Sequence, residues 1–234
     1  MKRRAARCPA CLIPQAFCIC QVAAPEELAT RVTVVVHYAD IDRTTNTGKW
    51  APVALTNSEV LIRGRRESPL DMSRAIQPDC HNLLLFPSKD SQQLSPDYVA
   101  ALTKPVNLIV PDGNWNQAGK MVKREAQMAA LPHVHLKIDK PTRYRLRTAA
   151  HQHWISTFEA ISRALGVLEN PALQARLEYF FDVAVERVLY LKGQIERDEV
   201  TGGISQEMVH QYHMDNGDQP YIQAHKPQDP DSAR

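Results

Sequence analysis

The feature that most limits how this chain can fold is a series of short, almost continuously apolar runs. The first, residues 31–37, reads RVTVVVH and is rich in the β-branched residues that favour strands. Four more runs of strand length follow, at residues 59–62, 83–86, 106–110 and 134–138. Strands that are apolar on both faces are typical of a parallel sheet covered by helices. The runs therefore predict an α/β fold with a mainly parallel sheet.

Helical patterns lie between these runs and after them. Residues 47–55, 96–102 and 115–128 alternate with the predicted strands. From residue 151 only helices are expected, over residues 153–168 and 171–196, and the second has apolar residues at spacings of three and four. Alternating strands and helices, followed by helices alone, predict one main α/β domain with C-terminal helices.

Composition and charge suggest a cytoplasmic protein that meets a polyanion. Its 234 residues, 44% of them hydrophobic, can bury one main core. No run approaches the roughly 18 apolar residues of a membrane span, and the basic N-terminus leads into cysteines, not into an apolar signal sequence. Residues 1–195 are net basic, whereas residues 196–234 hold 8 acidic and 3 basic residues. We expect three parts: residues 1–28, the α/β domain over residues 29–198, and a loosely ordered acidic tail over residues 199–234.

Four of the five cysteines lie close together near the N-terminus, with the spacing C-x2-C-x6-C-x-C. They are Cys8, Cys11, Cys18 and Cys20. Four thiolates so near one another suit a tetrahedral Zn²⁺ ion, and because they leave no open coordination position, we expect its role to be structural. Disulfide bonds are the alternative, although a reducing compartment argues against them.

A polar motif follows the apolar run at residues 106–110. It consists of Asp112, Gly113, Asn114 and Trp115 and precedes a helical pattern, so it occupies the turn at the carboxyl end of a buried strand. Open α/β sheets bind ligands in the crevice outside these strand ends. A carboxylate and an aromatic ring here indicate a ligand site, although Asp-Gly pairs are also common in ordinary turns.

Six motifs occur in a fixed order over about residues 8 to 190. They are the four cysteines, Asn46-Thr47-Gly48, Leu85-Phe86-Pro87, Asp112-Gly113-Asn114-Trp115, Tyr144 with Leu146 and Arg147, and Ser156-Thr157-Phe158-Glu159-Ala160. In this order they resemble the DTW-domain family of tRNA-uridine aminocarboxypropyltransferases. The chain departs from the family's name-giving motif at Asn114, where the family has Thr or Ser.

The resemblance implies a fold related to the knotted SPOUT methyltransferases, with S-adenosylmethionine held by loops at the carboxyl ends of the strands. It also implies that the 3-amino-3-carboxypropyl group, and not the methyl group, moves to N3 of a tRNA uridine. The by-product is then 5′-methylthioadenosine, and the target uridine is expected in the variable loop.

The implied reaction assigns a role to the polar motif. N3 of the uridine must lose its proton as it attacks, and Asp112 is the candidate base, beside a wall of low polarity made by Trp115. The alternative for Asp112 is to cap the helix that follows, since Asp is among the best N-cap residues.

Nine further residues complete the expected S-adenosylmethionine site: Asn46, Thr47, Gly48, Leu85, Phe86, Pro87, Ser156, Thr157 and Glu159. The first three open a helix and can offer backbone N–H groups. The next three end a buried strand and suit the adenine, and the last three can bind the carboxylate and ammonium of the amino acid part. Each group has a structural alternative: a helix cap, a core position and a capping box, respectively.

A basic segment and one residue outside it supply the expected contacts with tRNA: Arg43, Lys137, Lys140, Arg143, Tyr144, Arg145 and Arg147. Guanidinium groups bind phosphates, and aromatic rings stack on splayed bases. A solvated basic loop is the alternative.

Two other functions fit the same residues. A SPOUT-like RNA methyltransferase would release S-adenosylhomocysteine, and a zinc-stapled RNA-binding module without catalysis would release no adenosyl product. The by-product formed in the presence of tRNA distinguishes the three.

Overall fold

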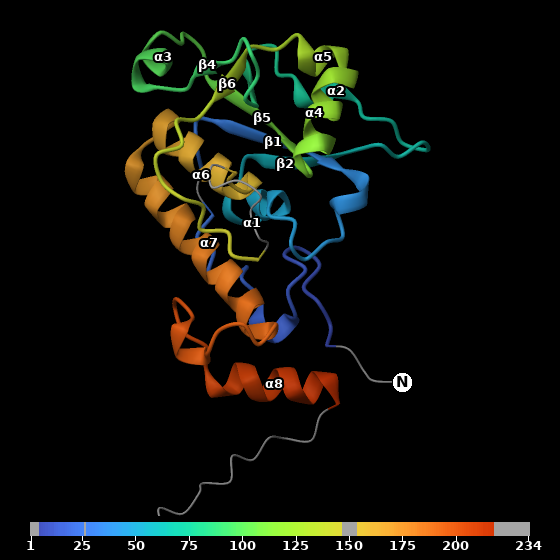
Figure 1. The fold of residues 1–234 in the computed structure, drawn as a ribbon, viewed down its shortest axis with the longest axis vertical. Coiled ribbons are helices and arrows are strands. Elements are labelled where there is room, and N and C mark those ends of the chain that lie inside the picture. The colour runs from blue at the N-terminus through green and yellow to red at the C-terminus, as the bar shows by residue number, and fades with distance from the viewer. Residues whose placement is uncertain (1–4, 26, 147–153, 218–234) are drawn as a thin grey trace, which may run out of the picture.

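Six parallel strands form one sheet in the part of the protein that the computed structural model describes, residues 5–25, 27–146 and 154–217 (Figure 1). They are β1 (Arg31–His37), β2 (Ser58–Arg63), β3 (His81–Leu85), β4 (Gln92–Gln93), β5 (Val106–Asp112) and β6 (His133–His135), in the order β2-β1-β5-β3-β6-β4. Each neighbouring pair is parallel, so the carboxyl ends share one edge. The predicted α/β fold with a parallel sheet is confirmed, whereas the knot implied by the resemblance stays a prediction.

The central strand β5 positions the polar motif. All seven of its residues are buried, as expected for a strand with neighbours on both sides and helices on both faces. The register pairs Val34 of β1 with Val110 and Val36 with Asp112. Asp112 is therefore the last residue of β5 and lies level with the end of β1.

The predicted apolar runs coincide with β1, β2, β3, β5 and β6, with ends that shift by a few residues. The sequence pattern misses β4, which consists of the two exposed residues Gln92 and Gln93 and carries no apolar signal. It pairs with β6 at the edge of the sheet, where a strand needs no apolar face.

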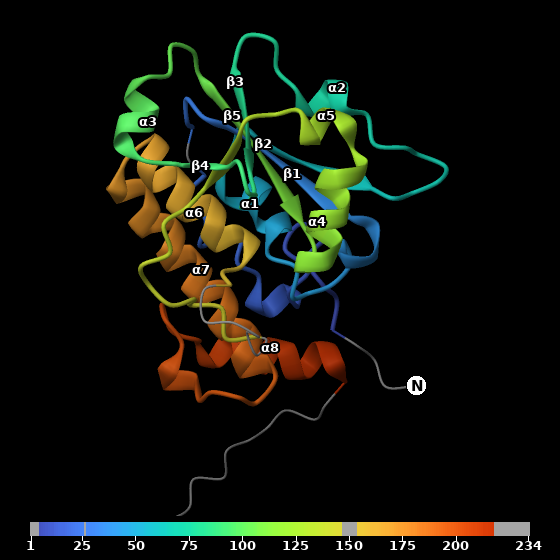
Figure 2. The ribbon, with the colours of Figure 1, turned by 45° about the horizontal axis from the view of Figure 1, so that its top comes forward.

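Helices cover both faces of the sheet (Figure 2). They are α1 (Ala51–Ala54), α2 (Met72–Ala75), α3 (Pro96–Ala100), α4 (Trp115–Arg124), α5 (Ala126–Ala129), α6 (Thr157–Leu168), α7 (Pro171–Leu191) and α8 (Gln206–Asn216). Side chains alternate along the strands: Val34 and Val36 join the core with α6 and α7, whereas Val35 joins the core with α2, α4 and α5. None of the described helices is long and apolar enough to cross a membrane.

Two predicted helices are shorter in the structure than the sequence pattern suggests. The helix expected over residues 115–128 is divided into α4 and α5 by Glu125, whose backbone is extended, with φ −93° and ψ 97°. The helix expected to reach residue 196 ends at Leu191, where its stripe of apolar residues stops. The backbone N–H of Lys192 then closes the last turn on the carbonyls of α7.

A cluster of aromatic rings joins α6 and α7 to the segments that hold Trp50 and Tyr144. Phe181 of α7 is 1% exposed and stacks on Phe158 of α6, with ring centroids 5.8 Å apart. Trp50 and Tyr144 lie 6.0 Å and 6.3 Å from the same ring. Phe181 thus connects α7 with three other segments, of which the one with Trp50 is distant in the sequence.

The segment after residue 199 is more ordered than the sequence analysis expects. Instead of a loosely ordered tail, residues 206–216 form α8, which is capped by Ser205 at its start and by Gly217, in a left-handed conformation, at its end. Tyr212 of α8 meets the ring of Phe17 edge to face at 5.4 Å. Contact with the N-terminal segment explains the helix, because its own sequence has no strong apolar stripe. Residues 218–234 of the expected tail lie outside the described residues.

The aromatic cluster predicts a contrast between two neighbouring positions of α7. Phe181→Ala should lower the free energy of unfolding by about 3–5 kcal/mol, because it leaves a cavity among the rings of Phe158, Trp50 and Tyr144. Tyr179→Ala, at a side chain that is 50% exposed, should change it by less than about 0.5 kcal/mol. Urea denaturation measures both values, and equal effects would contradict the packing described here.

Candidate functional site

The carboxylate of Asp112 is buried at the carboxyl edge of the sheet and held from two sides. Asp112 is 5% exposed. One of its oxygens accepts a hydrogen bond of 2.5 Å from the side-chain amide of Asn46, and the other accepts one of 2.5 Å from the hydroxyl of Thr157. Asn46 comes from the loop that follows β1, and Thr157 is the first residue of α6. Three separate segments thus meet at one carboxylate.

Gly48 is required by the close approach of this carboxylate. A Cβ atom at position 48 would lie 2.6 Å from one carboxylate oxygen of Asp112 and 3.0 Å from a methyl group of Val34. Next to it, the hydroxyl of Thr47 accepts a hydrogen bond of 3.2 Å from the backbone N–H of Phe158. The structure therefore brings three of the sequence motifs together: those around Asn46, Asp112 and Ser156.

The helix α4 is capped by Asn114, so the alternative role of Asp112 as its N-cap is wrong. The side-chain oxygen of Asn114 accepts from the backbone N–H of Gln117 at 2.9 Å, and the Gln117 side chain accepts from the backbone N–H of Asn114 at 2.7 Å. Asn, Ser and Thr all serve as N-caps. This shared property gives a physical reason why Asn can stand where the family motif has Thr or Ser.

Two adjoining cavities open at this edge of the sheet. A polar one, of about 260 Å³, is lined by residues that include Asp40, Asn46, Asp112, Thr142, Tyr144 and Thr157. A more apolar one, of about 380 Å³, is lined by residues that include Leu85, Phe86, Pro87, Leu136 and Ile138. Residues 113, 115 and 154–157 line both cavities. The arrangement suits a ligand with an apolar ring system at one end and a polar group at the other.

Aromatic rings form the wall shared by the two cavities. The ring of Trp115 lies 6.3 Å from that of Phe86 and 5.3 Å from that of Trp154. The sequence predicts Phe86 and Trp115 in the site but not Trp154. It carries no signal for Trp154, because only the structure shows that its ring lines both cavities.

The capping box predicted as the alternative for Ser156 and Glu159 is present. The Ser156 side chain accepts from the backbone N–H of Glu159, whose carboxylate accepts in return from that of Ser156 at 2.9 Å. The same carboxylate, 2% exposed, also accepts from the hydroxyl of Thr142 at 2.7 Å and from the backbone N–H of Arg143 at 2.6 Å. Glu159 does not line either cavity. The Glu159 carboxylate therefore holds the segment around Thr142 and Arg143 in place. The geometry does not support the expected contact between Glu159 and a substrate ammonium.

Arginines of the expected RNA-binding segment are paired with acidic residues of α7. Arg143 contacts Asp182 in a bidentate pair and Glu178 at 3.6 Å, and Arg145 lies 2.5 Å from Glu186. These acidic residues are four apart and so share one face of the helix. The arginine side chains are about half-exposed, at 45% and 52%, whereas the carboxylates of Asp182 and Glu186 are only 18% and 12% exposed. The two guanidinium groups therefore still present part of their surface to solvent.

The other expected RNA contacts differ in their surroundings. Lys137 and Lys140 are exposed, and Arg43 pairs with Asp40 at 2.9 Å. Tyr144 is not a free surface ring: its hydroxyl donates to the carbonyl of Thr45 at 2.7 Å, and its side chain lines the polar cavity. Arg147 lies outside the described residues.

A buried cation lies behind the carboxylate. Lys49 is 6% exposed, and its ammonium donates to the backbone carbonyl of Arg43. Its backbone N–H donates to the Asn46 side-chain oxygen at 3.2 Å, so this oxygen is engaged while the amide N–H₂ faces Asp112. Burial lowers the pKa of Lys49 to about 8. The loop that carries Asn46 is thereby fixed at both ends.

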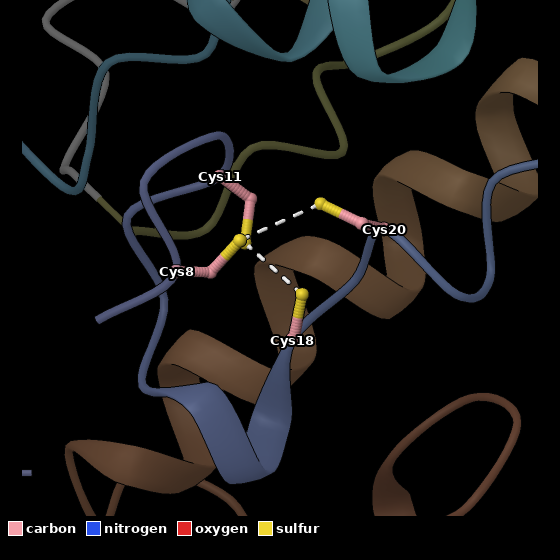
Figure 3. Close-up of side chains that lie close together, drawn as sticks. All are labelled: Cys8, Cys11, Cys18 and Cys20. Carbon is pink, nitrogen blue, oxygen red and sulfur yellow. Dashed lines mark hydrogen bonds between the residues drawn. The ribbon is translucent and has the colours of Figure 1, made fainter. Parts of the chain in front are cut away.

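The four N-terminal cysteines form a cluster that could hold a metal ion (Figure 3). Their Sγ atoms all lie within 4.8 Å of one another, with 3.7 Å between those of Cys8 and Cys20 and 3.8 Å between those of Cys11 and Cys18. Four sulfurs at the usual Zn–S distance of about 2.3 Å in a tetrahedron are about 3.8 Å apart. The thiols are not joined in disulfides. The geometry therefore fits a tetrahedral ion.

The backbone around the cysteines is shaped for this cluster. Leu12 adopts a left-handed conformation with φ 60°, which costs about 1–2 kcal/mol for a non-glycine residue and turns the chain between Cys11 and Ile13. Burial raises the pKa of the Cys18 thiol to about 11. Burial also acts to raise that of Cys8, but backbone hydrogen bonds from Cys11 and Ala10 outweigh it and lower the pKa to about 7. A bound cation would have to displace protons from these thiols.

Two side chains from the main domain support the cysteine segment. The buried guanidinium of Arg187 on α7 donates to the backbone carbonyls of Cys18 at 2.8 Å and of Phe17 at 3.3 Å. The indole N–H of Trp50 donates to the carbonyl of Cys11 at 3.3 Å. Removal of either donor would leave buried carbonyls beside the cluster without their partners.

The structure defines an α/β protein with a parallel sheet, two cavities at the carboxyl edge of that sheet and a four-cysteine cluster that could hold a metal ion. Residues 5–189 match the DTW domain, and the chain belongs to this family. Among curated proteins it is similar to tRNA-uridine aminocarboxypropyltransferase 2 of Mus musculus, with 25% identity over 181 residues, which cover 74% of this chain and 60% of that protein.

The protein of the same name from Macaca fascicularis is 23% identical over 173 residues, which cover 72% of this chain and 58% of that protein. The match thus spans less than two thirds of the length of these relatives. No solved structure gives a significant match.

The cysteine cluster predicts the metal content of the protein. Protein purified under reducing conditions should contain about one zinc ion per chain, and Cys18→Ser should lose the metal and unfold at lower urea concentration, because metal binding is coupled to folding. Cys80→Ser is the matched control, since Cys80 lies outside the cluster and should leave the metal content unchanged. Elemental analysis checks this prediction, and metal-free wild-type protein would refute it.

The packing at Gly48 predicts opposite effects for two glycine substitutions. Gly48→Ala should destabilise the protein by about 1–3 kcal/mol, because the new methyl group overlaps the Asp112 carboxylate. Gly119 lies inside α4, where a new Cβ atom would be 3.9 Å from a ring carbon of Phe86. Gly119→Ala should therefore stabilise the protein by about 0.5–1 kcal/mol. Urea denaturation measures both, and a stable Gly48→Ala variant would show that the carboxylate lies elsewhere.

Proposed function

We propose that this protein transfers the 3-amino-3-carboxypropyl group of S-adenosylmethionine to N3 of a uridine in tRNA. Membership of the DTW family and the names of its two relatives support this proposal. The observation that carries it is the buried carboxylate of Asp112, held by Asn46 and Thr157 where a polar cavity adjoins an apolar one. The proposal includes a cytoplasmic location and a structural zinc ion held by the four cysteines.

The two cavities fit the two ends of the donor. Leu85, Phe86 and Pro87 offer an apolar wall and backbone groups for the adenine. The hydroxyls of Thr142 and Thr157 and the amide of Asn46 line the polar cavity and suit the charged amino acid part. Trp115 lines both cavities, so its ring would lie near the sulfonium that joins the two ends of the donor.

The reaction forms a nitrogen–carbon bond, breaks a carbon–sulfur bond and moves one proton. N3 of the uridine attacks the side-chain carbon next to the sulfonium, the carbon–sulfur bond breaks with its electron pair on sulfur, and 5′-methylthioadenosine leaves. The proton on N3 passes to Asp112. The methyl group is attached to the same sulfur, so the choice of carbon depends on orientation, which can supply several kcal/mol.

Asp112 is suited to the role of base by the contacts it already has. Its two hydrogen bonds fix the plane of the carboxylate, and its side chain lines the polar cavity in which the uridine would react. A positioned base of this kind contributes roughly 10²–10⁴-fold in rate.

The surface around the polar cavity suits an RNA substrate. Lys137 and Lys140 are exposed, and the half-exposed guanidinium groups of Arg143 and Arg145 can contact a phosphate from their solvent side. N3 lies on the Watson–Crick edge of uridine, so the target must be an unpaired base, as in a loop of tRNA. We assign the target to the variable loop on the basis of the family resemblance.

The decisive experiment combines product identification with the Asp112→Asn variant. Wild-type protein incubated with S-adenosylmethionine and unmodified tRNA should release 5′-methylthioadenosine, and only when tRNA is present. Asp112→Asn should lower the single-turnover rate by about 10²–10⁴-fold while tRNA binding is retained, because the amide cannot accept the proton. Asp97→Asn, at an exposed carboxylate of α3, is the matched control and should keep the wild-type rate.

The other outcomes contradict the proposal in different ways. S-adenosylhomocysteine as the product would make the protein a methyltransferase. Release of neither product, with tRNA bound, would favour a binding module. Full activity of Asp112→Asn would leave the reaction in place but remove Asp112 as its base.

A further inference from the structure

Trp154 lies at the border of the two cavities and has no role in the site described so far. Its side chain is 36% exposed, and its ring lies 5.3 Å from that of Trp115, which is 37% exposed. Both indoles line the polar cavity and the apolar cavity. Both indoles therefore present part of their surface to a ligand in these cavities.

We infer that Trp154 is a stacking subsite for the base of the nucleotide that accepts the transferred group. This inference rests on the proposed function and deepens it, because it names the surface that holds the acceptor. A target base that has left its own stack loses the contacts of its two faces. An exposed indole replaces such a contact for any base, since stacking does not depend on base identity.

The position of Trp154 relative to Asp112 favours the acceptor base. Trp154 begins the short segment that ends at Thr157, whose hydroxyl donates to the Asp112 carboxylate at 2.5 Å. Three residues span at most about 10 Å of chain, and both side chains line the same cavity of about 260 Å³. A base stacked on the indole can thus turn its N3 edge toward Asp112. Stacking fixes the plane of the ring, and the carboxylate then meets the one edge that reacts.

The order of the aromatic rings separates this subsite from that of the donor. Phe86 lines only the apolar cavity, and Trp115 contacts both Phe86 and Trp154. The adenine therefore has the face formed by Phe86 and Trp115, with the aliphatic residues Leu136 and Ile138 around it. Trp154 stands at the other end of this row, beside the polar cavity.

The test uses a probe in which only one base can stack. A trinucleotide with a central uridine between two abasic nucleotides is compared with the fully abasic trinucleotide, for wild type, Trp154→Ala and Trp154→Phe. The uridine should strengthen binding to wild type by roughly 5-fold to 150-fold, the range that stacking of one base supplies. Trp154→Ala should lose this advantage and Trp154→Phe should retain most of it. Tyr179→Ala should behave as wild type, because the ring of Tyr179 is exposed and lines neither cavity.

Affinity for S-adenosylmethionine supplies the opposing readout. In Trp154→Ala it should stay within about twofold of wild type, and thermal unfolding of each variant confirms that it is folded. An unchanged uridine advantage in Trp154→Ala, or a loss confined to S-adenosylmethionine, would overturn the inference. The probe needs no turnover, so the two proposals can fail separately. Without 5′-methylthioadenosine, a uridine advantage that depends on Trp154 still establishes the subsite, and turnover without that advantage leaves only the reaction.

Discussion

The two hydrogen bonds on the Asp112 carboxylate are the interaction on which the site depends. Asn46 and Thr157 donate them from the loop after β1 and from the start of α6, and Gly48 leaves room for the carboxylate between the two. A buried carboxylate is tolerated because both oxygens are paired. The same contacts set the distance between the sheet and α6, which forms part of both cavities. The requirement for a satisfied charge thus fixes the shape of the cleft as well as its chemistry.

The sequence predicts the features that depend on local pattern. Buried parallel strands are apolar on both faces, so residues 31–37 and 106–110 are evident without tertiary information. The cysteine spacing likewise leads directly to the observed cluster. The two-residue strand β4 has no such signal, and α8 forms against a surface supplied by the opposite end of the chain. Such elements depend on contacts that no local window contains.

The roles of individual site residues follow the same division. Asn114 and Asp112 are both good caps by propensity, and only the structure decides that Asn114 caps α4 while Asp112 faces the cavity. Glu159 has the residue type for an ammonium ligand, yet its oxygens are used by Thr142, Arg143 and Ser156. The charge of Arg143 is evident in the sequence, whereas its partner Asp182 lies 39 residues away. Residue type therefore identifies candidates, and the partners of each polar atom decide among them.

The support of the cysteine cluster has a consequence for the order in which the protein can mature. Chains are synthesised from the N-terminus, so the four cysteines are made first. Trp50 follows soon after them, but other supports come late: Arg187 donates to the carbonyls of Phe17 and Cys18, and Tyr212 packs on Phe17. The backbone N–H of Ala5 also donates to the Asn216 side chain at 2.9 Å. A metal ion bound early in synthesis would therefore lack these supporting contacts. They form only when nearly all the described chain has been synthesised and folded.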